Sequence, residues 1–345
     1  MGWMFEGAVL PAGEVGRIVV GAGEIQALPG RFALPGLVDA HCHLTVAVDQ
    51  HGPYLDSSLA EPRLGELAAS GVATIRDVGG DPAVTLPLTR EAPRPGRPLV
   101  VSAGRFFAPA QRYFPRMFTP VAAGDLLSEV IAEICSGARW IKLIGDFPQV
   151  DGLQPVPGTT SPTYPSEVVA AIVGAAHARG VRVAAHSTHS GVADLVAAGV
   201  DSIEHGDELD ADLVQALGRR GGAWTPTLGA IPEIATPDLL LDPEQRRRRG
   251  RRTERLRHLL PLALDAGVTV LTGSDVVGSV WREVALLAEL GLNPEQALAA
   301  ASTRAQQYFG CADDGSLVTY ATDPRDDPSA LTHPAAVVIR SVRIH

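Results

Sequence analysis

Eight short apolar runs alternate with helical patterns along most of this chain. Each run is rich in apolar and β-branched residues, which is typical of strands that are buried on both faces of a parallel sheet. Most of the helical patterns end at a glycine, which can adopt the positive φ that closes a helix. Eight strands alternating with helices is the count of a (β/α)8 TIM barrel, an α/β fold. We therefore predict strands over residues 34–44, 72–77, 98–102, 139–144, 180–185, 200–205, 222–227 and 267–272.

The helices are predicted from apolar residues that recur with helical spacing between these runs. Two more helices are expected after the last strand, and Asn293 caps the second of them, with Pro294 at its first position. The predicted helices cover residues 126–135, 166–179, 192–198, 211–219, 243–266, 282–290 and 294–309.

The two ends of the chain differ from its middle. Residues 3–32 and the segment from residue 311 onward carry short apolar runs between glycine, proline and other turn residues. This pattern indicates small antiparallel strands. We expect the ends to pair, so that residues 1–33 and 311–345 form one small β domain beside a barrel of residues 34–310.

Charge and cysteine usage limit the partners and the location. The net charge of -10 argues against nucleic acid or an acidic membrane as a partner. No apolar run is long enough to span a membrane, and the first residues lack a secretory pattern. Cys42, Cys135 and Cys311 show no paired spacing, so we expect a reducing, cytoplasmic location. The arginine run at 246–252 is interpreted as a solvated helix face.

His41 and His43 stand at the end of the first predicted strand. Residues two apart on a strand project from the same face, so both imidazoles can reach one cation while Cys42 points away. Neutral imidazole is the commonest transition-metal ligand, although a His-x-His pair is weak support by itself. The pair is half of a candidate metal site.

The other half comes from the ends of later strands. In a barrel of this kind the active site lies at the carboxyl ends of the strands. Four more groups with ligand or acid–base chemistry fall at such positions, and all six together are hard to ascribe to chance. The candidate ligands are His41, His43, Lys142, His186, His205 and Asp275.

These residues lie in motifs that resemble the amidohydrolase superfamily, and more narrowly its imidazolonepropionase- and prolidase-like branch. The motifs are Pro35-Gly-Leu-Val-Asp-Ala-His-Cys-His43, the strand-four lysine, Ser202-Ile-Glu-His-Gly206 and Gly273-Ser-Asp275. The resemblance covers nearly the whole chain. Its tail, residues 323–340, resembles the strands that close these enzymes, which implies that the small domain is a β-sandwich.

The resemblance implies a centre of two divalent metal ions. His41, His43 and Asp275 would hold one ion, His186 and His205 the other, and Lys142 would bridge them after carboxylation by CO2. A lysine desolvated among apolar neighbours has a lowered pKa, and its carbamate is an anionic bidentate ligand. Zinc suits the imidazole-rich set, and manganese, cobalt and iron are alternatives.

Two metal ions that bridge a water would lower its pKa toward ~7 and polarise a substrate carbonyl. Hydroxide would then attack at neutral pH. Asp275 is the candidate general base, which would pass the proton on to the leaving nitrogen. Asp39 and Glu204 are candidates to hold the imidazoles in one tautomer.

The chain departs from the family pattern at two places. Thr188 stands where relatives often have a second histidine, with His189 one position further on. His189 is therefore a candidate substrate contact, or else a helix cap or surface residue. Residues 312–316 replace the family's usual Gly-Lys-x-Ala-Asp run, which concerns the small domain and not the metal site.

The loop of residues 104–118 is rich in phenylalanine and arginine. If it covers the barrel mouth, Arg112 or Arg116 would bind an acidic end of the substrate. Phe107, Tyr113 and Phe114 would contact its apolar body, with Tyr113 also a candidate oxyanion donor. The alternative is a loop that packs on the barrel rim for stability.

Together these features predict a binuclear metal-dependent amidohydrolase that cleaves a C–N bond in a small dipeptide-like or cyclic amide. One alternative is a mononuclear deaminase of the same fold, in which Lys142 would be a bystander. A second alternative is a non-catalytic barrel scaffold. The expected partner is a small-molecule substrate, and a homo-oligomer is compatible with the sequence.

Overall fold

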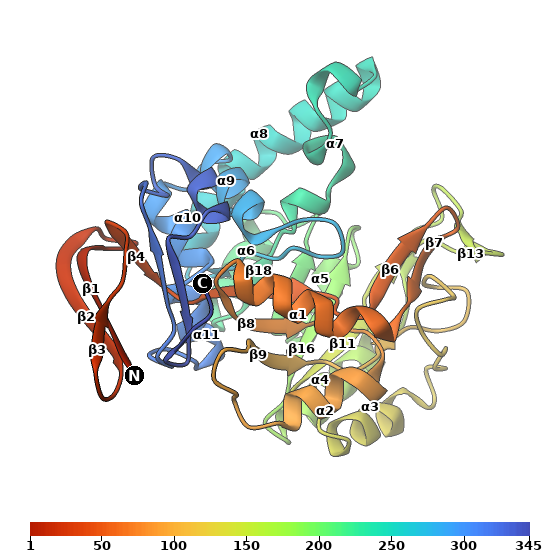
Figure 1. Ribbon diagram of the computed structural model, residues 1–345. Helices are drawn as coiled ribbons and strands as arrows, with labels where there is room; N and C mark the ends of the chain where they lie inside the picture. Colours follow the sequence, from red (N-terminus) through yellow and green to blue (C-terminus); the bar gives the residue numbers. More distant parts are fainter.

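Eight parallel strands form a barrel-like ring in the computed structural model, which describes residues 1–345 (Figure 1). All eight predicted strands are present, although the last two are shorter than expected, and the strand predicted over residues 34–44 covers only Leu37–Cys42 because Leu34 and Pro35 pair with the terminal sheet. The strands are β5 (Leu37–Cys42), β8 (Val72–Asp77), β9 (Leu99–Ser102), β11 (Trp140–Ile144), β16 (Arg182–Ser187), β17 (Ser202–His205), β18 (Ala223–Thr225) and β19 (Thr269–Val270).

Backbone hydrogen bonds close this ring at its two less regular joins. Between β9 and β11, the short strand β10 (Phe106–Phe107) continues from β9 and pairs with β11. Between the last strand and the first, the Ala40 amide donates to the Thr272 carbonyl (2.9 Å) and the Asp275 amide donates to the His41 carbonyl (2.7 Å). The second of these bonds ties a candidate metal ligand to the strand that carries another.

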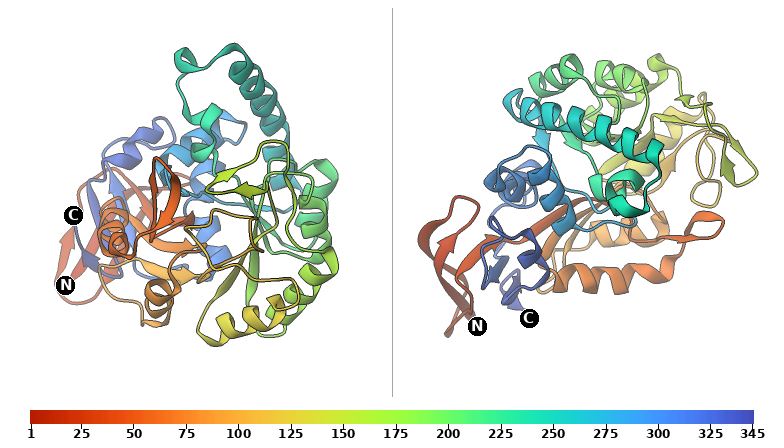
Figure 2. Two further views of the ribbon diagram at one scale, coloured as in Figure 1. Left: turned by 90° about the vertical axis from the view of Figure 1, so that its right-hand side faces the viewer. Right: turned by 90° about the horizontal axis from the view of Figure 1, so that it is seen from above.

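Helices surround the strands on the outside (Figure 2). Three of them, α3, α5 and α6, have the predicted bounds. Asp210 caps α6 by accepting a hydrogen bond from the Leu213 amide, which satisfies one free donor of the first turn. The helices are α1 (Ala60–Ala69), α2 (Pro82–Arg90), α3 (Leu126–Cys135), α4 (Ser166–His177), α5 (Val192–Ala198), α6 (Ala211–Arg219), α7 (Pro232–Ala235), α8 (Pro243–Asp265), α9 (Val280–Glu289), α10 (Pro294–Ala300) and α11 (Thr303–Phe309).

The single helix predicted over residues 294–309 is wrong, because the structure divides it into α10 and α11. Ser302 leaves helical geometry (φ -140°, ψ -104°), and its hydroxyl donates to the Leu298 carbonyl at 2.6 Å. The carbonyls of Ala300 and Ala301 accept hydrogen bonds from Thr272 and Val38 of the barrel seam. Tertiary hydrogen bonds therefore replace the helical ones at the break.

The two ends of the chain form one seven-stranded sheet, as their expected pairing requires. Its order is β2-β1-β4-β20-β21-β22, and β3 pairs with β1. Because these strands belong to one hydrogen-bonded sheet, a sandwich of two sheets is not confirmed. The strands are β1 (Gly2–Val9), β2 (Glu14–Gly21), β3 (Ile25–Ala27), β4 (Phe32–Pro35), β20 (Leu317–Tyr320), β21 (Ala336–Ile339) and β22 (Val342–Arg343).

The two faces of β20 and β21 pack into different apolar clusters. Leu317 and Val338 join Trp3 and Phe5 in a small cluster within the terminal sheet. Residues of the opposite parity, such as Val318, join the main core of 59 buried residues. Period-2 alternation thus lets one sheet pack against the barrel and keep a small core of its own.

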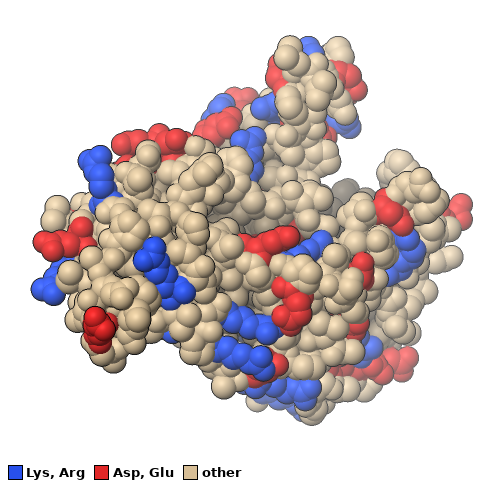
Figure 3. All heavy atoms as spheres, viewed as in Figure 1, with Lys and Arg blue, Asp and Glu red and all other residues tan.

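Short hairpins lie at the carboxyl ends of the barrel strands, on the side away from the terminal sheet (Figure 1). The molecule is hollowed between the projecting α7–α8 segment and the hairpin of β6 (Val46–Asp49) and β7 (Gly52–Leu55) (Figure 3). Two further pairs lie there: β12 (Asp146–Phe147) with β15 (Ser161–Pro162), and β13 (Val150–Asp151) with β14 (Gln154–Pro155).

Acidic and basic side chains are interspersed over the face shown in Figure 3. The predicted arginine-rich helix is α8, where Arg247 and Arg251 are exposed and face Glu244. Arg252 is only 26% exposed and lies against acidic residues of other elements. None of the helices combines the length and the apolar character needed to cross a bilayer.

Candidate metal centre

His41 and His43 lie side by side at the end of β5, as their spacing predicts. Both rings are buried, and their centroids are 5.2 Å apart. Cys42 between them donates a weak hydrogen bond to the Arg76 carbonyl on the neighbouring strand (3.7 Å). The strand thus presents two imidazoles toward the barrel mouth.

A buried ion pair orients His41. Its Nδ1 lies 2.6 Å from Glu204 Oε2, and Glu204 Oε1 accepts a 2.8 Å hydrogen bond from Arg76. Burial alone would raise the pKa of Glu204, but the Arg76 guanidinium and the His41 hydrogen bond hold it well below its ordinary range. Burial also lowers the pKa of His41 to about 3, so the imidazole is neutral, as a metal ligand must be.

Two more imidazoles are also oriented by a hydrogen-bond partner at Nδ1. Nδ1 of His43 lies 2.7 Å from the Gly79 carbonyl, and Nδ1 of His205 lies 2.6 Å from the Thr227 hydroxyl. A partner at Nδ1 sets the tautomer and leaves Nε2 as the free ligand atom. The three imidazoles therefore offer the same nitrogen.

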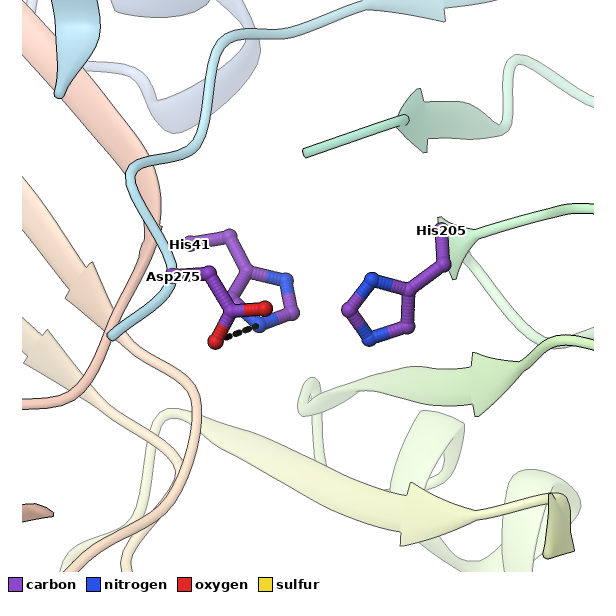
Figure 4. A group of neighbouring side chains, drawn as sticks. All are labelled: His41, His205 and Asp275. Carbon is purple, nitrogen blue, oxygen red and sulfur yellow. Dashed lines mark ion pairs between the residues drawn. The ribbon is translucent and has the colours of Figure 1, made fainter. Parts of the chain in front are cut away.

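Asp275 completes the group from the segment that follows the last strand, β19. It adopts φ +55°, and its Oδ1 lies 3.4 Å from His43 Nε2 and 3.8 Å from His41 Nε2. Ligand atoms of His41, His205 and Asp275 all lie within 4.8 Å of one another (Figure 4). Burial would raise the pKa of Asp275, but the His43 hydrogen bond and the neighbouring imidazoles hold it well below its usual range, so the carboxylate is ionised.

Lys142 and His186 carry buried nitrogens that lack a hydrogen-bond partner, namely Nζ and Nε2. Unpaired buried polar atoms are costly and call for an explanation such as an ion. Lys142 is the only lysine in a chain with 29 lysine and arginine residues. Burial lowers its pKa to about 8, which makes the neutral amine accessible. A guanidinium stays protonated, so an arginine at this position would not offer a neutral amine.

All six candidate ligands line one cavity of about 220 Å³. Its remaining lining is mostly apolar and includes Tyr113, Phe114 and Met117 from the loop of residues 104–118. A concave, mainly apolar site with a few convergent polar groups is typical of small-molecule binding. The donors present, four imidazoles, a carboxylate and an amine, fit a divalent transition metal.

Asp39 does not contact an imidazole. Its carboxylate accepts hydrogen bonds from the His41 amide (3.3 Å) and from the Ser274 amide and hydroxyl (3.1 and 2.5 Å). The expected role as a tautomer-setting acid therefore holds for Glu204 and is wrong for Asp39. Asp39 instead joins β5 to the residue that precedes Asp275.

Three expected substrate contacts lie outside the cavity lining. Arg112 donates to the carbonyls of Phe147 (2.7 Å) and Ser161 (2.5 Å), and Arg116 pairs with Asp49 (2.6 Å). These bonds use the guanidinium groups to fix loops at the rim. His189 is exposed, with its Nδ1 3.0 Å from the Ser190 hydroxyl.

The aromatic residues of the same loop divide between the cavity and the core. Tyr113 lines the cavity, and its ring lies 4.9 Å from Phe147 and 6.2 Å from His186. Phe114 lines it as well, whereas Phe107 is buried in the main core and cannot touch a substrate there.

Replacing Arg76 with methionine is expected to destabilise the fold by about 3–5 kcal/mol, because it leaves the buried Glu204 charge without its partner. Urea-induced unfolding measures the change. The matched control is Arg97→Met, which removes a pair with the largely exposed Glu61 and should cost about 1 kcal/mol or less. Equal losses of stability in the two variants would contradict the assigned role of Arg76.

Comparison with known proteins gives two kinds of similarity. The amidohydrolase family model matches residues 32–319. The uncharacterized protein Rv2915c of Mycobacterium tuberculosis strain H37Rv is 32% identical, over 92% of this chain and 87% of that protein.

Solved structures share the fold at lower identity. A prolidase complexed with N-methylphosphonate-L-proline aligns with a TM-score of 0.76 at 21% identity, covering 100% of this chain and 99% of that chain. A Xaa-Pro dipeptidase with methionine bound in its active site aligns with a TM-score of 0.78 at 20% identity, covering 100% of each chain. The family match over most of the sequence and the resemblance of the motifs agree, and the chain belongs to the amidohydrolase family.

Proposed function

We propose that the protein is a binuclear metal-dependent hydrolase that cleaves the C–N bond of a small amide, either dipeptide-like or cyclic. The observation that carries this proposal is the single cavity lined by His41, His43, Lys142, His186, His205 and Asp275. The unpartnered Nε2 of His186 and Nζ of Lys142 support it further, because a cation would satisfy the imidazole nitrogen and carboxylation would convert the amine into an anionic ligand.

In the proposed arrangement, His41, His43 and Asp275 would hold one ion, and His186 and His205 would hold the other. Lys142, once carboxylated, would be a ligand to both. When bound, the ions would supply Lewis acidity and lower the pKa of a coordinated water toward ~7. Zinc suits this donor set.

The chain's own groups would bind the substrate and move the proton. Asp275 is ionised and faces the imidazoles, so it is the candidate that accepts a proton and passes it to the leaving nitrogen. Glu204 keeps His41 in one tautomer throughout. Tyr113 is the candidate donor to a developing oxyanion, and Phe114 and Met117 exclude water from the apolar side.

The prolidase-like fold of the solved neighbours supports a dipeptide-like substrate. The presence of all six donors favours this enzyme over a mononuclear deaminase or a non-catalytic scaffold. We also propose that residues 1–33 and 311–345 act as one small β domain beside the 34–310 barrel, based on their shared sheet and apolar cluster. The three free cysteines are in keeping with a reducing, cytoplasmic setting.

The proposal predicts about two divalent ions per chain, together with hydrolysis of members of a panel of dipeptides and N-acyl amino acids. Elemental analysis gives the metal content, and detection of the released amine gives the activity. Chelation should abolish turnover, and added Zn²⁺ should restore it. One tight ion with release of ammonia from an amino-substituted ring would favour the deaminase. Two ions without hydrolysis of any amide would contradict the proposed substrate class.

A further inference from the structure

A second cavity, of about 300 Å³, opens onto the same candidate ligands. It shares His186, His205, Ala230 and Asp275 with the first cavity. We call it the charged groove, because Asp207, Glu233 and Arg252 line it as well. A substrate whose reacting bond lies at the shared residues can therefore extend in two directions.

The three charged side chains of the groove form one cluster. Arg252 Nη2 lies 2.6 Å from Asp207 Oδ2, and Nη1 lies 3.4 Å from Glu233 Oε2. Their exposed fractions are 26%, 18% and 20%, so the cluster is partly shielded from solvent. Arg252 thus contacts both carboxylates at a wall of the groove. Arg248 approaches the other oxygen of Glu233 at 3.6 Å, but its side chain is 53% exposed and is not part of the lining.

The lining of the first cavity is different. Away from the ligands it is mostly apolar, with Val48, Phe114, Met117 and Val277 among its lining residues. Val48 and Val277 are exposed, so the open side of this cavity also carries apolar side chains. The two cavities therefore favour opposite chemistry on the two sides of the shared ligands.

We propose that the enzyme, acting as in the proposed function, selects amides with one apolar half and one cationic half. Asp207 and Glu233 would bind the cationic half in the charged groove. An ammonium or guanidinium group would add donors to carboxylates that are only partly paired. A carboxylate ligand would have to displace one of the two acids from Arg252 and lie against the other. The geometry therefore favours a cation, which would compete with Arg252 for the two acids.

Binding of two simple probes tests the charge preference without turnover. Leucinamide carries an ammonium group, and N-acetylleucinamide has the same apolar body without the charge. Calorimetry with the metal-loaded and the metal-depleted protein should show tighter binding of leucinamide, by roughly ten- to a hundredfold, the range expected for one charge-assisted hydrogen bond. Equal affinities for the two probes would overturn the proposal.

Variants assign the preference to the groove. The double variant Asp207→Asn, Glu233→Gln should lose most of the preference, while Arg252→Gln should strengthen leucinamide binding, because it removes a positive charge that competes for both carboxylates. The matched control is Glu244→Gln, which removes one acid of α8 that lines neither cavity and should leave both affinities unchanged. Weaker leucinamide binding in a folded Arg252→Gln variant, as judged by its melting temperature, would overturn the assignment.

Hydrolysis assays then distinguish the source of the cation. Leu-Ala against N-acetyl-Leu-Ala tests an α-ammonium group, and N-acetyl-Leu-Lys against N-acetyl-Leu-norleucine tests a side-chain cation. At least one charged member should have a roughly tenfold higher kcat/KM than its neutral partner, and the double variant should remove this difference. Equal hydrolysis within both pairs would overturn the groove's role and leave the amidohydrolase proposal standing. Absence of all hydrolysis would count against the amidohydrolase, while the probe affinities would still decide the groove.

Discussion

Replacing Asp275 with asparagine is expected to lower kcat by about 10²- to 10⁴-fold while the protein keeps its fold and much of its bound metal. Asparagine has the same shape and retains a side-chain oxygen, but it cannot accept the proton. The wild-type carboxylate is ionised and lies 3.4 Å from His43 Nε2, which places it among the candidate metal ligands. Steady-state kinetics and elemental analysis of the same preparation measure the two quantities.

Main-chain contacts make this variant informative. The Asp275 amide donates to the His41 carbonyl, and this bond does not depend on the side chain. The melting temperature should therefore stay close to that of the wild type. An unchanged kcat at full metal content would remove Asp275 from the proton-transfer role.

Replacing Lys142 with methionine is expected to lower kcat/KM by at least about 10³-fold, since the carbamate would be lost and several kcal/mol of metal-based stabilisation with it. Metal content should fall below two ions per chain. The fold should persist, because methionine replaces a buried amine that has no hydrogen-bond partner in the structure. Activity, metal content and melting temperature together separate a lost ligand from an unfolded protein.

The chain offers a direct observation of the carbamate. Lys142 is its only lysine, so protein labelled with ¹⁵N-lysine contains a single ε-nitrogen signal. In the presence of ¹³C-bicarbonate and metal, that nitrogen should couple to a carbamate carbon, and the signal should be absent in Lys142→Met. An ordinary ammonium at Lys142 in an active, metal-loaded sample would contradict the bridging role.

Much of the fold could be predicted from local pattern alone. The strand at residues 72–77 and the helices at 126–135, 192–198 and 211–219 have the predicted bounds, because their apolar periodicity agrees with the tertiary structure and a glycine with positive φ follows each helix within two residues. The helix break at Ser302 could not be predicted. It depends on hydrogen bonds from Thr272 and Val38, and these residues are distant in sequence.

In the candidate site, too, some features could be predicted from the sequence and others could not. The six strand-end groups could be placed together, since the barrel brings the carboxyl ends of its strands to one side. Arginine contacts could not be predicted, because a long flexible side chain such as Arg112 can reach many partners, and backbone carbonyls claim it here. The sequence did not identify Glu233 and Arg252 as residues near the site. They lie in α7 and α8, and the arginine run of α8 was interpreted as a solvated helix face.

The seam between the first and last strands has a consequence for the evolution of this site. The junction between residues 39–41 and residues 272–275 both closes the barrel and carries candidate metal ligands, so metal binding there would be thermodynamically linked to global stability. A substitution at Ser274 that touches no donor atom would still alter both. Tolerance to change should consequently be lower here than at the other strand junctions, even for residues that never meet the substrate.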